Sequence, residues 1–316
     1  MPLFSYECTV TSDWIAEEAL TVTSRYTESL DGAFTEIEVL REGEAPNYQV
    51  MCPSPDERIC SRFNGDGFAM YEYVFKELGF RMPFSDFQKS MMAFLNLAPS
   101  QLHPNAFAFM RAFEIVCNYL GIGATTALFG RCFRVQRQAA DGRYGWVSFK
   151  NAERKLFGMY TDSVKGFKDR YFVVRPLSPT AYYDVSDSVV LRDADGELVR
   201  GEDGQVAREF CTRFPFFWWK GHFSSPPKHY VWEDGDLDEQ DAESYSVLCK
   251  YVDSFTMSRW VTRNGNPVLD ENGVPVVEQR PINTRALLSC RTPEETRSLL
   301  GRVRSPCFSS SVLCFR

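Results

Sequence analysis

The chain has 316 residues and a formal net charge of −7, and its apolar and charged residues (44% and 24%) are in ordinary globular proportions. A chain of this length can bury a sizeable core and hold two domains. The negative balance argues against non-specific nucleic-acid binding by the chain as a whole, and no run reaches the roughly 18 apolar residues that a membrane span needs.

The charge is unevenly distributed along the chain. Residues 1–60 carry a net charge of −9, residues 61–230 carry +5, residues 231–279 carry −8 and residues 280–316 carry +5. This pattern indicates a mildly basic folded middle with acidic flanks and a basic end. The ten cysteines show no dense disulfide spacing, and the N-terminus has no secretory leader pattern. We therefore expect an intracellular protein, nuclear or cytoplasmic.

Residues 1–66 are rich in turns and acidic side chains, so we expect an acidic, loosely ordered arm. Residues 68–78 then form a predicted helix. Gly79 follows it in the left-handed position that a helix end favours.

The next helices are separated by a proline-rich hinge. Pro83 opens a segment to Leu97 whose apolar residues recur at three-to-four spacing, which is typical of one buried helical face. Residues 98–104 contain Pro99 and Pro104, which forbid a continuous helix. Pro104 suits the first position of a helix that continues to Leu120 and is apolar on nearly all sides. A short helical piece is expected after it.

From Cys132 onward the hydrophobic period changes from helical to alternating. Asp141-Gly142 is a hairpin-turn signal between two apolar runs, and residues 171–174 are a third predicted strand. Asp195-Gly196 marks a further turn. The fold class is therefore predicted as α+β. A helical core, about residues 68–131, packs beside a small antiparallel β-sheet, about residues 132–199, with irregular acidic flanks.

The C-terminal part, residues 223–316, is expected to be a linker, short helices and an irregular tail. Residues 231–245 are strongly acidic and are predicted as a solvated linker. A helix is expected over 244–261 and a weak hairpin over 268–277. Thr292-Pro293-Glu294-Glu295 has the hydroxyl, proline and glutamate of a helix start.

The sequence offers no catalytic, metal-binding or cofactor-binding residues to predict. His103 lies between Leu102 and Pro104, which favours hinge packing or helix capping. His222 and His229 are seven residues apart, which fits no metal module with paired ligands. No glycine-rich phosphate loop occurs. An enzyme with a site assembled only in space stays open, and His103 or His222 beside a cysteine or two carboxylates would support it.

A basic stretch at residues 131–175 suggests a second class of function. It has a net charge of +7 and interleaved aromatic residues, which could neutralise and stack RNA or DNA. The alternative is that alternate residues simply face core and solvent. The candidate nucleic-acid contacts are Arg131, Arg134, Arg137, Lys165, Lys168 and Arg170.

Several motifs resemble the plant "putative gypsy type transposon" domain family over about residues 70–220, within a domain placed at 67–222. The motifs are Gly79-Phe80-Arg81-Met82-Pro83-Phe84, Leu97-Ala98-Pro99-Ser100-Gln101-Leu102-His103-Pro104-Asn105-Ala106, Phe113, Cys117, Leu120-Gly121 and Lys165-Gly166-Phe167-Lys168-Asp169-Arg170-Tyr171-Phe172-Val173-Val174. Within them, Gly79, Pro83, Pro99, Gln101, Pro104 and Asn105 are the predicted structural motif residues.

The resemblance implies a retrotransposon-derived protein, but it brings no catalytic residues, because none are assigned to the family. The chain also lacks the Asp-Thr-Gly or Asp-Ser-Gly protease motif, the Tyr-x-Asp-Asp polymerase motif and the nucleocapsid zinc knuckle. We therefore expect a non-enzymatic, gag-like or accessory protein without a cofactor. Its expected partners are a second copy of itself or another protein, with RNA or DNA as the alternative and no membrane.

Overall fold

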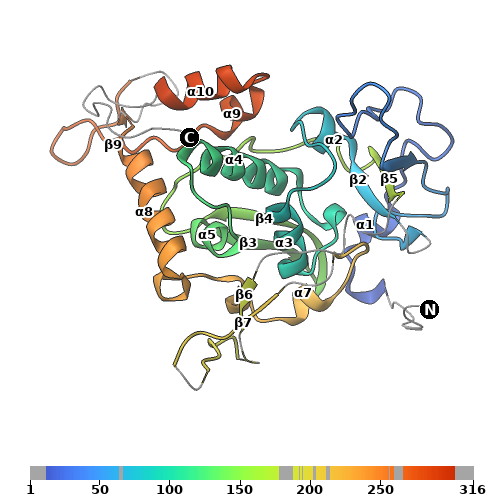
Figure 1. Ribbon diagram of the computed structural model, residues 1–316, viewed down its shortest axis with the longest axis horizontal. Coiled ribbons are helices and arrows are strands. Elements are labelled where there is room, and N and C mark those ends of the chain that lie inside the picture. Colours follow the sequence, from blue (N-terminus) through green and yellow to red (C-terminus); the bar gives the residue numbers. More distant parts are fainter. Residues whose placement is uncertain are drawn as a thin grey trace.

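The computed structural model describes residues 12–63, 67–177, 188–191, 193, 195–201, 204–210, 214–255, 257–259 and 266–302. Within these residues the fold is α+β, as predicted. Buried helices occupy the centre, short antiparallel sheets lie beside them, and three C-terminal helices line the outside (Figure 1).

Helix α4 (Pro104–Leu120) is the centre of the core, and eleven of its seventeen residues are buried. Pro104 stands at its first position, as predicted, and Gly121 ends it with a left-handed φ of 69°. Helices α3 (Asp86–Leu95) and α5 (Thr126–Cys132) lie close to α4. The hinge between α3 and α4 contains a short 3₁₀ helix, η3 (Pro99–Gln101), so the predicted break is confirmed.

The hairpin of β3 (Phe133–Ala140) and β4 (Arg143–Asn151) confirms the turn predicted at Asp141-Gly142. Both turn residues have positive φ, 52° and 75°, which matches the right-handed twist of the two strands. Trp146 and Phe149 of β4 are buried against the helices.

The predicted helix over residues 68–78 is only half correct. Phe68–Tyr71 forms a strand, β2, and α2 (Glu72–Lys76) follows it directly. All four residues of β2 are buried and pair with a strand a hundred residues away. Long-range pairing therefore overrides the local helical pattern here. Gly79 ends the segment with a left-handed φ of 67°, as predicted.

The single sheet predicted over residues 132–199 is wrong. Strand β5 (Tyr171–Pro176) lies between β1 (Tyr48–Met51) and β2, antiparallel to both, and not beside the β3–β4 hairpin. Strands β6 (Ser188–Val190) and β7 (Arg208–Phe210) form a separate ribbon. The prediction failed because both strands that pair with β5 lie before residue 72. One of them, β1, lies in the segment that was predicted to be loosely ordered.

The loosely ordered arm predicted for residues 1–66 is also wrong for the residues that the structure describes, 12–63. This segment is irregular but packed, with Trp14, Ile15 and Ile59 buried in the core. Its acidic side chains serve as hydrogen-bond acceptors. The Glu38 carboxylate, for example, accepts from the amides of Asn47 and Tyr48, both at 3.1 Å. A few widely spaced buried apolar residues thus fix a segment whose composition is typical of disordered chains.

The acidic linker predicted at residues 231–245 is replaced by the start of helix α8 (Glu239–Asp253). Asp238 caps this helix by accepting from the Asp241 amide at 2.8 Å. Asp241 is buried and accepts from the Thr125 hydroxyl at 2.7 Å. Part of the acidic run is therefore used for capping and core contacts.

The remaining C-terminal elements are two outer helices and a hairpin. Helices α9 (Thr284–Ser289) and α10 (Pro293–Arg302) lie beside α4, and Thr292 accepts from the Glu295 amide at 3.1 Å, which confirms the predicted helix start. Strands β8 (Ser258–Arg259) and β9 (Val277–Glu278) pair at the base of the hairpin. The irregular tail predicted from residue 305 onward lies outside the described residues. No helix in the described ranges is long and apolar enough to cross a membrane.

Ser100 of η3 connects three distant segments through buried hydrogen bonds. The Tyr71 hydroxyl donates to the Ser100 carbonyl at 3.0 Å, and the Trp146 indole donates to the Tyr71 hydroxyl. The Trp218 indole donates to the Ser100 hydroxyl at 2.9 Å. A hinge that looks like a simple connection is thus the polar centre of the core.

Tyr71→Phe should lower the free energy of unfolding by about 1–3 kcal/mol, because it strips a buried indole N–H and a buried carbonyl of one partner each. Chemical denaturation measures this change. Tyr119→Phe is the matched control, since its hydroxyl has no hydrogen-bond partner among the described residues. Equal stability of the two variants would contradict the role of this network.

Candidate functional site

The predicted structural motif residues occupy the hinge and its surroundings. The Gln101 side chain accepts from the Ala98 amide at 3.0 Å, and the Asn105 side chain donates to the Thr161 carbonyl at 2.8 Å. Pro99 is the first residue of η3 and Pro104 is the first residue of α4. Gly79 precedes the loop that leads into α3, and Pro83 lies within that loop. The polar side chains of the motif hold backbone segments together.

The half-buried His103 and the buried His222 both have structural roles. His103 caps α4, and its Nδ1 accepts from the Asn105 amide at 3.1 Å, so the predicted capping is confirmed. His222 Nδ1 lies 2.8 Å from the Leu95 carbonyl, and its Nε2 accepts from Arg137 at 3.2 Å. Burial, aided by Lys168, lowers the pKa of His103 to about 4, and burial, aided by Arg137, lowers that of His222 to about 3. Both rings are therefore neutral at physiological pH.

These pKa values predict a loss of stability in mild acid. The unfolded chain takes up protons on both histidines below about pH 6.5, whereas the folded chain does so only near pH 4 or 3. Stability should therefore fall between pH 6.5 and 4, by up to about 1.4 kcal/mol per pH unit for each histidine. His103→Asn keeps a capping side chain and should remove the contribution of His103 to this pH dependence, leaving that of His222.

Urea denaturation at several pH values between 7.5 and 4.5 measures this slope for wild type and His103→Asn. An unchanged slope in the variant would show that His103 is not buried as a neutral group.

Half of the six candidate nucleic-acid contacts cluster near helix α5 and strand β3, where each has a protein partner. Arg131 is buried, bonded to Asp234 at 2.7 Å, and lies over the Tyr245 ring. Arg134 donates to the Gly130 carbonyl at 2.9 Å. Arg137 donates to the carbonyls of His222 and Ser225 at 2.8 and 3.0 Å.

The other three candidates precede strand β5. Lys168 pairs with Glu18 at 2.6 Å and lies 4.3 Å from the centre of the Trp146 ring. Arg170 pairs with the buried Glu72 at 2.7 Å, and Lys165 is exposed. Burial opposes ionisation of Glu72, but hydrogen bonds from Arg170 and the Phe34 amide outweigh it and lower the Glu72 pKa. Lys168 thus ties the N-terminal segment to the approach to β5, and Arg170 ties α2 to it.

The aromatic residues of the basic stretch do not form an exposed stacking surface. Their rings are buried, apart from the half-buried Tyr144 and Tyr160, and Tyr144 stacks on Phe223 at a centroid distance of 4.2 Å. The buried set is Phe133, Trp146, Phe149, Phe157, Phe167, Tyr171 and Phe172. Nucleic-acid binding by this stretch stays a prediction. The cations of the stretch that the structure leaves exposed are Arg143, Lys150, Lys155 and Lys165.

The nucleic-acid hypothesis predicts salt-dependent retention of the protein on immobilised single-stranded RNA. Charge reversal at the exposed residues Arg143, Lys150 and Lys165 should abolish such retention without disturbing the core. Reversal at Lys168 or Arg170 is less informative, because it would place two carboxylates together at Glu18 or Glu72. Unaltered retention of the triple variant would show that this stretch is only a solvated face.

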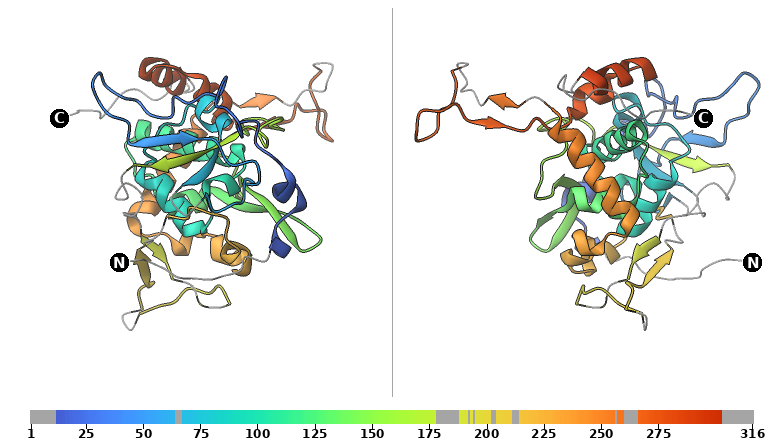
Figure 2. Two further views of the ribbon diagram at one scale, coloured as in Figure 1. Left: turned by 90° about the vertical axis from the view of Figure 1, so that its right-hand side faces the viewer. Right: turned by 60° about the vertical axis from the view of Figure 1, so that its left-hand side comes forward.

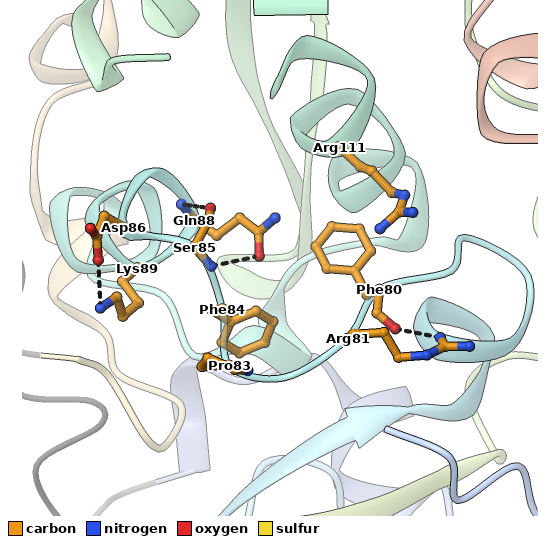
Figure 3. Close-up of a pocket in the computed structure, with 9 residues that line it drawn as sticks. All are labelled: Phe80, Arg81, Pro83, Phe84, Ser85, Asp86, Gln88, Lys89 and Arg111. Atoms are coloured by element: carbon orange, nitrogen blue, oxygen red, sulfur yellow. Dashed lines mark hydrogen bonds and ion pairs between the residues drawn. The ribbon is translucent and has the colours of Figure 1, made fainter. Parts of the chain in front are cut away.

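A cleft of about 610 Å³ lies between the Phe80–Ser85 loop, the first turn of α3 and the outer face of α4 (Figure 3). Arg81 is fixed at its edge by bonds to the carbonyls of Phe75 and Phe80 at 3.0 and 2.6 Å. Arg111 of α4 lies over the Phe80 ring at 5.7 Å, and Lys89 of α3 pairs with Asp86 at 2.7 Å. Three cationic side chains thus border one opening.

Beneath this cleft, Glu114 of α4 accepts hydrogen bonds from Ser85 and Gln88. Burial raises the Glu114 pKa, although these bonds and Arg111 oppose the shift. Burial and the nearby Arg81 lower the pKa of Arg111, and Glu114 only partly offsets them. The positive charge of Arg111 is therefore partly desolvated, and the attraction of Glu114 does not restore its ordinary pKa.

The cleft was not predicted from the sequence. The Gly79–Phe84 motif was identified, but only as a structural one, and Arg111 lies on a helix that was interpreted as wholly buried. The available signal in the sequence was a charged residue within an otherwise mostly apolar helix. In the residues that the structure describes, no group of three histidine, cysteine or acidic side chains is placed to hold a metal ion.

Residues 71–137 match the family model described as "putative gypsy type transposon". The match runs from the end of β2 through the hinge, α4 and α5 into β3, and it includes the cleft. It confirms the resemblance for this segment, which is about a fifth of the chain. Comparisons with curated proteins and with solved structures gave no significant match.

Proposed function

We propose that this chain is a non-enzymatic, gag-like or accessory protein of a retrotransposon that acts by self-association or partner binding. The family match supports the lineage. The structural roles of His103 and His222 support a non-catalytic function, because their ring nitrogens are occupied by the Asn105 amide, the Leu95 carbonyl and the Arg137 guanidinium.

The observation that carries the proposal is a hairpin that projects from the body. We call its described residues, 257–259 and 266–278, the arm (Figure 2). Its base is held by Gln279, whose side chain donates to the carbonyls of Val252 and Phe255 at 2.6 and 3.2 Å. Its far end is an ordered turn in which the Asp270 carboxylate accepts from the Asn272 and Val274 amides.

The arm presents apolar side chains to solvent. Leu269 is 54% exposed, Val274 is 56% exposed and Val277 is 49% exposed. A two-stranded ribbon cannot cover its own apolar side chains and is marginally stable alone in water. A second surface that covered these apolar side chains would therefore stabilise the arm.

A second copy of the chain supplies such a surface. Two arms related by a two-fold axis present the same apolar side chains to each other, which is the usual way in which identical chains associate. Self-association through the arm is thus the form of the proposal that the geometry favours, with another protein as the alternative partner.

Leu269→Asp combined with Val274→Asp should shift the protein from an associated form to a monomer, because two charges would have to be buried in the contact. Sedimentation velocity over a wide concentration range measures this. Val39→Asp is the matched control, since Val39 is 76% exposed on the N-terminal segment, away from the arm. A wild type that stays monomeric throughout would contradict self-association.

A further inference from the structure

We propose that the cleft between the Phe80–Ser85 loop, α3 and α4 binds an acidic peptide segment of a partner protein, with one carboxylate on Arg111 and a second on Lys89. The cleft (Figure 3) belongs to the family segment, and none of its lining residues lies in the arm. Its volume of about 610 Å³ is within the range of ligand-binding pockets.

Arg111 is the main reason to expect an anion here. Its guanidinium is partly buried and held against Phe80 at 5.7 Å, yet within the described part of the chain it has no hydrogen-bond acceptor or ion-pair partner. A partly buried guanidinium with no acceptor from the described residues favours an incoming anion, and a carboxylate can accept two parallel bonds from it. Glu114 attracts Arg111 electrostatically, but its oxygens accept hydrogen bonds from Ser85 and Gln88 and form none with Arg111.

Lys89 supplies a second positive charge on the other side of Ser85 (Figure 3). Its side chain is 12% exposed, whereas that of its partner Asp86 is 71% exposed. An incoming carboxylate can therefore join Asp86 at the outer side of Lys89. Arg81 adds to the positive potential near Arg111, since its charge further lowers the pKa of Arg111.

The arrangement favours an extended peptide over a nucleotide or a single small anion. The cations lie on opposite sides of the cleft and do not converge on one point, so they suit two carboxylates spaced along a chain. The Phe80 and Phe84 rings are 1% and 3% exposed, which leaves no aromatic face on which a base could stack. The exposed Pro83 between them offers an apolar contact for the peptide backbone.

Fluorescence anisotropy with a labelled octapeptide of alternating glutamate and glycine tests the proposal. The wild type should bind this peptide and not its glutamine counterpart. Arg111→Gln and Lys89→Gln should each weaken binding at least tenfold, whereas Arg111→Lys should weaken it less, because it keeps the charge but loses the two-pronged geometry. Arg297→Gln removes an exposed positive charge on α10 and should change nothing.

Circular dichroism establishes that the variants are folded, so a loss of binding reports on the cleft. Absence of binding by the wild type, or binding that Arg111→Gln leaves unchanged, would overturn the proposal. Inorganic phosphate and unlabelled oligo-dT are tested as competitors of the labelled peptide. If either displaces it at lower concentration than the unlabelled peptide does, the proposal is overturned in favour of a phosphate site. The Leu269→Asp, Val274→Asp variant should bind the peptide normally, which separates this site from self-association through the arm.

Discussion

The structure depends on the buried hydrogen bonds that surround the 3₁₀ turn at Pro99–Gln101. Two prolines interrupt the helices here, so several backbone groups must find partners that a continuous helix would have supplied. Tyr71, Trp146 and Trp218 converge on Ser100 directly or through one another. Because these residues lie on three separate segments, the turn fixes how β2, β4 and the segment after residue 214 meet. The residues of the family motif are explained by this architecture, with no need for a chemical role.

Charge complementarity then attaches the flanking segments to this core. The positive middle and the negative flanks of the sequence, at first interpreted as separate regions, form pairs across the fold. Lys168 bonds to Glu18 and Arg131 bonds to Asp234, while Arg170 bonds to Glu72 within the middle region. The first pair holds the N-terminal segment beside β5, the second holds the segment before α8 against α5, and the third links α2 to the residue before β5. Cations that contact carboxylates in this way are less available to a polyanion, whereas Arg111 has no such partner among the described residues.

Local patterns predicted much of the fold, and long-range pairing accounts for what they missed. The hinge, α4 with its proline start and glycine end, the β3–β4 turn and the Thr292 cap depend on neighbours within a few residues, and all were predicted. The three-stranded sheet depends on a pairing between residues 48–51 and 173–176, for which the sequence has no local signal. The cleft was missed for the same reason, because Arg111 and the Phe80–Ser85 loop meet only in the folded chain. Capping by His103 was predictable, but the network around Ser100 was not.

Native-state hydrogen exchange, resolved by mass spectrometry of peptides, tests most directly the claim that the hinge is the centre of the fold. If it is, amides of residues 97–106 exchange only when the whole domain unfolds, as slowly as those of α4 and far more slowly than those of the arm. If the hinge is merely a connection between helices, its amides exchange by local opening, faster than those of α4. That second result would contradict the account.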